Sequence, residues 1–153
     1  MPAPKMDTNL PFRLGQHPFD VHVYFKSDAE AAFAATFKTR LLARFDWLKE
    51  GRWNDSASRM SPHPLPMFEV LGGEMKNIVK VNEVIEWLDA NRGGLSVLIH
   101  PNTTDGNVQD HCVHQVWLGE PVAMRVWVFH ANKSVKLVLA LASAAVILWA
   151  LNR

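Results

Sequence analysis

The chain has 153 residues, with 16 Lys and Arg against 15 Asp and Glu and a formal net charge of +1. This length suits one domain with an ordinary hydrophobic core and leaves no room for a second catalytic domain. The balanced charge argues against nucleic-acid binding as the main function, because such proteins carry a surplus of basic residues. A single cysteine excludes an intramolecular disulfide and a cysteine-rich zinc site, whereas seven histidines direct attention to a metal site or to acid–base chemistry.

The two ends of the chain differ in character. Residues 1–17 form an N-terminal arm with three prolines and no apolar run. The arm does not resemble a secretory signal, so a cytoplasmic location is expected. Residues 137–151 are apolar and uncharged but fall short of the about 20 residues that usually span a membrane. We predict an apolar helix over residues 131–153, buried against the body of the protein or in an oligomer interface; the alternative is membrane association through residues 137–151.

Residues 18–130 are predicted to form one α+β domain. Alternating apolar residues predict a first strand over residues 20–25, and Ser27 and Asp28 then offer N-caps to a helix that ends near residue 44. Strands are predicted over residues 45–53 and 67–71, on either side of a loop rich in serine and proline. The remaining predicted elements are a helix (75–91), a strand (95–99), a loop (101–106) and two strands (114–118 and 122–129).

This order, β-α-β-β-α-β with appended strands, is typical of a ferredoxin-like sandwich. Its antiparallel sheet carries two helices on one face and leaves the other face open for a site or a partner. Side chains alternate across a strand, so the apolar positions of the first strand should meet the helices while His22 and Tyr24 point to the open face. The same alternation places Glu69 and His100 on that face.

Three of these side chains are expected to converge. The first and third strands are central in this topology and the fourth lies beside the first, which brings together His22, Glu69 and His100, with His63 at their edge. Two imidazoles and a carboxylate are typical ligands of non-haem iron(II) oxygenases, and three imidazoles suit zinc or iron. The alternative is a set of ordinary hydrogen-bonded histidines and, for Glu69, a solvated charge.

Other polar and aromatic residues carry weaker signals. His111 and His114 lie at the predicted start of a strand, where acid–base chemistry or substrate binding is as reasonable as metal ligation. Arg52 and Arg92 could hold a substrate carboxylate, and Trp53 could line an aromatic pocket. The ordinary alternatives are solvated arginines near the ends of elements and a tryptophan packed in the core.

Four segments, in order along the chain, resemble the DOPA 4,5-dioxygenase family: DVHVYF (20–25), SPHPLPMFEV (61–70), NRGGLSVLIHPNT (91–103) and DHCVHQVWLGE (110–120). The resemblance spans residues 18–121. It implies a small ferredoxin-like, iron(II)-dependent extradiol dioxygenase that opens the ring of L-DOPA or another catechol with O₂. Two features depart from the family: Asn54 stands where many relatives have a histidine, and the apolar tail has no counterpart in compact members.

With this resemblance, His22, His63 and His100 are expected to bind the iron. If His63 is not a ligand, Glu69 is expected to take its place. The expected catalytic residues are His111, His114 and Glu69, and the expected substrate contacts are Tyr24, Arg92 and Trp53. A homodimer is expected. The alternatives are a dimeric binding or assembly module, whose sheet face is an interface, and a cofactor-free quinol monooxygenase.

Overall fold

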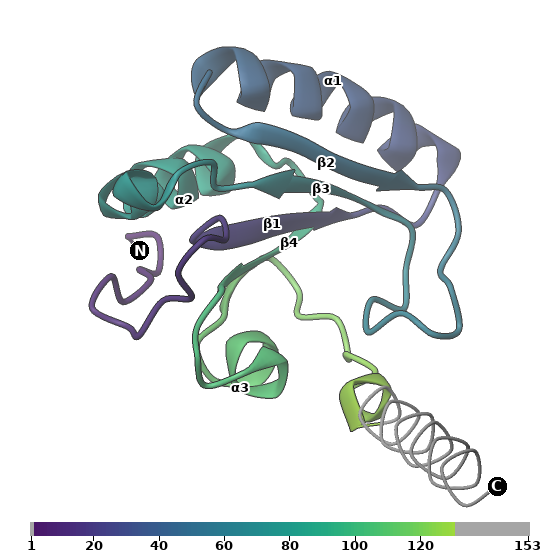
Figure 1. The fold of residues 1–153 in the computed structure, drawn as a ribbon. Helices are drawn as coiled ribbons and strands as arrows, with labels where there is room; N and C mark the ends of the chain where they lie inside the picture. Colours follow the sequence, from purple (N-terminus) through teal and green to yellow (C-terminus); the bar gives the residue numbers. More distant parts are fainter. Residues whose placement is uncertain (1, 131–153) are drawn as a thin grey trace, which may run out of the picture.

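A five-stranded antiparallel sheet organises the part of the chain that the structure describes, residues 2–130 of a computed structural model (Figure 1). The strand order is β2-β3-β1-β4-β5, so β1 is central. On β1, His22 lies opposite Glu69 of β3 and Leu98 of β4. The strands are β1 (Phe19–Tyr24), β2 (Lys49–Asn54), β3 (Met67–Leu71), β4 (Ser96–Pro101) and β5 (Val116–Leu118).

Two helices, α1 (Asp28–Arg44) and α2 (Val81–Asn91), cover one face of the sheet and form the main core with it. Helix α1 begins where the Ser27 side chain accepts a hydrogen bond from the backbone N–H of Glu30. Phe37 of α1 and Ile85 of α2 are fully buried in the same cluster as Val21 and Val23. The predicted inward set of the first strand is therefore confirmed.

The opposite face of the sheet is not open along its whole length. Tyr24, Met67 and Leu98 form a second buried apolar cluster there, covered by side chains that include Leu65 and Met124. A short helix, α3 (Asn107–Cys112), also lies on the side of the sheet away from α1 (Figure 1). The polar end of this face, around His22, carries the site described below.

Three predicted elements differ from the structure. The second strand begins at Lys49 rather than at residue 45, because Phe45 caps α1 and packs into the core. The predicted helix over residues 75–91 is a 3₁₀ helix (Met75–Lys80) followed by α2. The predicted strand over residues 122–129 is wrong: the backbone there pairs with no strand in the described part of the chain, and it turns into helix at residue 127.

Helix α3 was not predicted at all, and the expectation that His111 lies at the start of a strand is wrong. At six residues the helix is too short for an apolar period to appear in the sequence. Between residues 2 and 130 no helix has the length and apolar character needed to cross a bilayer. The predicted tail helix, residues 131–153, lies outside the described residues.

Candidate metal centre

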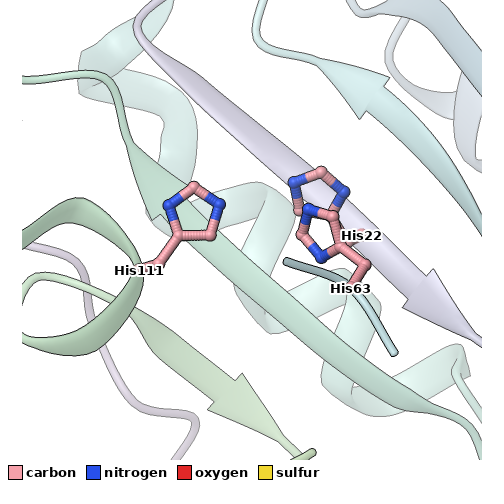
Figure 2. Close-up of side chains that lie close together, drawn as sticks. All are labelled: His22, His63 and His111. Atoms are coloured by element: carbon pink, nitrogen blue, oxygen red, sulfur yellow. The ribbon is translucent and has the colours of Figure 1, made fainter. Parts of the chain in front are cut away.

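Four histidines from four separate segments meet beside β1. They are His22 on β1, His63 in the loop before β3, His100 on β4 and His111 on α3, and all four are buried. Ring centroids are 4.0 Å apart for His22 and His63, and 3.8 Å apart for His100 and His111. Figure 2 shows three of these rings approaching one another from β1, the loop and α3.

Hydrogen bonds at the outer edges of three rings determine which nitrogen faces the cluster. The Nδ1 of His100 lies 3.0 Å from the carbonyl of Pro101, and the Nδ1 of His111 lies 2.9 Å from the carbonyl of Asn107. A carbonyl can only accept, so each Nδ1 carries a hydrogen, and in the neutral ring the Nε2 then has the lone pair. The Nδ1 of His63 also bonds outside the cluster, 2.7 Å from the Tyr24 hydroxyl, which can donate or accept.

His22 is at the centre of the cluster. Its Nε2 lies 3.1 Å from the Nε2 of His100, and its buried Nδ1 has no hydrogen-bond partner among the described residues. Two groups in the described region bring three donor atoms within 4.8 Å of one another: His22 with His63 and His111, and His22 with Asp20 and His100. Two nitrogens bound to one cation at about 2.1 Å and at right angles lie about 3.0 Å apart. The donor set therefore fits a divalent transition metal.

The charge state of the cluster also suits a metal. Burial lowers the pKa of His22 well below its ordinary value, and the neighbouring imidazoles lower it further. Burial likewise lowers the pKa of His63 to about 3 and the pKa of His111 to about 2. Neutral imidazole is the form that binds metal ions, so these three rings need lose no proton on binding one at neutral pH.

Two carboxylates flank the histidines, and both have other partners. Glu69 accepts hydrogen bonds of 3.0 Å from both Nε and Nη2 of Arg52, while its Oε1 lies 3.9 Å from His22 Nδ1. Asp20 lies 2.6 Å from His17 Nε2 and 3.8 Å from His100 Nε2. Each carboxylate therefore places negative charge beside the cluster while a cationic or polar neighbour holds it in place.

A buried aspartate anchors the helix that carries His111. Asp110 is 1% exposed, and its carboxylate accepts hydrogen bonds from both the backbone N–H and the hydroxyl of Thr103. Arg13 adds an ion pair at 3.4 Å. Gly106 precedes the helix with a φ of +100°, a conformation that favours glycine. These contacts dock α3 against the end of β4 and so place His111 beside His100.

The cluster lines a cavity of about 410 Å³. Phe129 forms part of its wall and packs against His111, with ring centroids 4.9 Å apart. Arg52 and Glu69 also line the cavity. Polar groups at the end of β2, in the loop before β3 and on α3 complete the lining, among them Asn54, Ser56, Ser61 and Asn107.

Several predicted site residues lie elsewhere. Trp53 stacks on Phe25 and Phe68 on the helix-covered side of the sheet. Arg92 donates to the Leu95 carbonyl, and His114 Nε2 lies 2.9 Å from Asp105. None of these three predicted residues lines the cavity. Tyr24 is 1% exposed and contacts His63 from behind rather than lining the cavity.

Two residues of the site were missed from the sequence. Asp20 shares the face of His22 because the two are separated by one residue on β1, so the alternation rule could have found it. Phe129 gave no comparable signal, because its position depends on how the segment after β5 returns over the sheet. His111 was expected as an acid–base residue, and the structure places it within one of the candidate ligand groups.

Comparisons with known proteins identify one family and two similar proteins. The sequence model of the Dopa 4,5-dioxygenase family matches residues 19–128. An uncharacterized 21.2 kDa protein of Botryotinia fuckeliana is 35% identical over 115 residues, which cover 69% of this chain and 60% of that relative. A crystal structure of a candidate dioxygenase from Nostoc punctiforme is 34% identical, with a TM-score of 0.67 and coverage of 84% of this chain and 99% of that one.

Proposed function

We propose that this chain, which belongs to the Dopa 4,5-dioxygenase family, opens the ring of a catechol such as L-DOPA with O₂ at a non-haem iron(II) site. The family match and the structural neighbour both support a dioxygenase-type function. The observation that carries the finer proposal is the buried cluster of four histidines, three of which have their Nδ1 bonded outside the cluster.

His22, His63 and His111 are the proposed ligands. Their ring nitrogens lie within 4.8 Å of one another, and burial keeps all three rings neutral. This set differs from the expectation from sequence in that His111 replaces His100. Held by these residues, iron(II) would supply the activation of the catechol and of O₂ that extradiol ring opening requires.

His100 is the proposed acid–base residue. Its Nδ1 donates to the Pro101 carbonyl, and its Nε2, which lies 3.1 Å from His22 Nε2 in the protein alone, would accept the proton of a catechol hydroxyl. The Asp20 carboxylate, 3.8 Å from that nitrogen, would stabilise the imidazolium that forms. The same proton can later return to the product. Both atoms of O₂ enter the ring-opened product, so the reaction needs no external reductant.

Arg52 is proposed to contact the substrate. Its Nε and Nη2 are occupied by Glu69, whereas its side chain is 66% exposed and lines the cavity. The remaining edge of the guanidinium can therefore receive a substrate carboxylate. Glu69 would hold the guanidinium in place rather than ligate the metal.

The strand order β2-β3-β1-β4 supports the ferredoxin-like form of the α+β fold. We also propose that the protein works as a cytoplasmic homodimer. Its partners would then be a catechol and O₂, with no nucleic acid.

Oxygen uptake with parallel visible spectra tests the proposal. The protein would be reconstituted anaerobically with Fe(II) and given L-DOPA and a panel of catechols. Iron-dependent uptake with a new yellow chromophore is expected. Uptake in metal-free protein would indicate a cofactor-free monooxygenase instead. Absence of uptake with every catechol, despite one equivalent of bound iron, would contradict the proposal and favour a binding module.

A further inference from the structure

Tyr24 is buried next to the metal centre, and its hydroxyl has two neighbours. The side chain is 1% exposed and stacks on Trp117 at a centroid distance of 5.8 Å. The hydroxyl oxygen lies 2.7 Å from His63 Nδ1 and 3.7 Å from Met124 Sδ. Apolar side chains surround the ring, so the hydroxyl has no access to bulk water and must be satisfied by these two partners.

His63 depends on such a contact more than the other histidines do. His22 and His100 lie on strands and His111 on a docked helix, whereas His63 lies in a loop between Pro62 and Pro64. Within residues 2–130, its backbone N–H bonds only to the nearby Ser61 hydroxyl. Neither sheet hydrogen bonds nor a helix orients this residue. Among the described residues, its ring is oriented by the hydrogen bond with Tyr24 and by packing against the rings of His22 and His111.

We propose that Tyr24 is a positioning residue for the metal centre, which acts by holding His63 through Nδ1 so that Nε2 faces the cavity. When a cation takes the Nε2 lone pair, the remaining hydrogen of the neutral imidazole is on Nδ1. That N–H donates to the tyrosine oxygen, and the tyrosine O–H turns to Met124 Sδ, a weak acceptor. The inference rests on the proposed metal site.

The segment that supplies Met124 is tied to the loop that supplies His63. The backbone N–H of Arg125 donates to the Pro62 carbonyl at 2.9 Å, and its Nη1 donates to the Ser58 carbonyl at 2.9 Å. These two bonds join the segment of Met124 to the loop of His63, and these are the two residues that contact the Tyr24 hydroxyl. Strand β1 therefore holds the Tyr24 hydroxyl, while the two segments that are bonded to each other hold the Met124 sulfur and the His63 imidazole on either side of it.

Because Tyr24 is the only tyrosine in the chain, it can be observed directly. Protein labelled with ¹³C at tyrosine Cζ would give one resonance, and Zn²⁺ would be titrated as a diamagnetic probe. We expect the chemical shift of the resonance to change with added Zn²⁺ and to stop changing at one equivalent.

In Tyr24→Phe, Zn²⁺ affinity measured by competition with a chromogenic chelator should fall about 10- to 100-fold. Met124→Leu removes the sulfur but keeps the side-chain volume. It should shift the tyrosine resonance and lower the Zn²⁺ affinity by less than Tyr24→Phe does.

Leu98→Met is the matched control, since it repacks the same apolar cluster without touching the hydroxyl. It should keep wild-type affinity. Equal Zn²⁺ affinity in wild-type protein and Tyr24→Phe, or a tyrosine resonance that ignores bound Zn²⁺, would overturn the role of Tyr24 and leave the metal site standing. Failure of the wild-type protein to bind any metal would overturn both proposals, so the two failures are distinguishable.

Discussion

His22 and His100 lie on adjacent strands with their Nε2 atoms 3.1 Å apart. They are diagonal neighbours in the β1–β4 ladder, because His22 is paired with Leu98 and His100 with Asp20. Two nitrogens at this distance cannot both carry a proton without repulsion. The pair therefore shares one hydrogen, which is on His22 Nε2 when His100 Nδ1 donates to the Pro101 carbonyl, and His22 belongs to both candidate ligand groups.

Replacing His22 should abolish metal binding. His22→Gln removes the one residue common to both groups, so the bound metal after dialysis should fall from one equivalent per chain to near zero. Elemental analysis of protein loaded with Fe(II) or Zn²⁺ measures this. His130→Gln, which changes an exposed histidine, is the control and should keep one equivalent. Retention of a full equivalent in His22→Gln would refute the site.

The metal-free protein should lose stability as the pH falls below 6.5. The folded state lowers the pKa of His63 to about 3 and that of His111 to about 2, whereas both titrate near 6.5 in the unfolded chain. Between these values the unfolded state binds more protons, so the free energy of unfolding decreases with decreasing pH. Each ring kept neutral contributes a slope that rises toward about 1.4 kcal/mol per pH unit well below pH 6.5, where the unfolded imidazole is fully protonated.

Urea unfolding with chelator present, at pH 7.0, 6.0 and 5.5, measures this slope above the range where most carboxylates titrate. In His111→Asn the slope should decrease by the contribution of one imidazole, whatever the change in absolute stability. The same slope in both proteins would show that His111 is not held neutral by burial.

Arg52→Leu should affect stability and substrate binding separately. The buried Glu69 carboxylate loses two charge-assisted hydrogen bonds, which should lower the free energy of unfolding by about 1–3 kcal/mol. If Arg52 binds a carboxylate, KM should rise about 10-fold or more for L-DOPA but little for catechol, which has no carboxylate. Arg59→Leu, which replaces another exposed arginine, should change neither quantity. An equal rise in KM for both substrates would argue against direct contact.

Asp110→Ala should release helix α3 and with it His111. The Thr103 backbone and hydroxyl lose their acceptor, and we expect a destabilisation of about 1–3 kcal/mol together with weaker Zn²⁺ binding. Urea unfolding and a chelator competition test the two effects. Gln109→Ala, an exposed change on the same helix, should leave both values unchanged. Loss of stability with unchanged affinity would mean that α3 does not deliver a ligand.

The sequence determined the elements that have a strong local signal. The alternation on β1 predicted which side chains meet the helices, and it placed His22 and Tyr24 on the other face, as the structure confirms. The same rule, with the expected strand order, brought His100 beside His22. These predictions succeeded because side-chain direction along a strand is a local property of the backbone.

Only the tertiary structure decided which histidines complete the cluster and what holds them. His111 reaches it because buried Asp110 docks a six-residue helix onto the end of β4, a contact that leaves no periodic pattern in the sequence. Likewise, the contact between Tyr24 and His63 joins residues 39 apart through a proline-flanked loop. Such positions depend on long-range packing and on the satisfaction of buried polar groups, which no local pattern along the chain records.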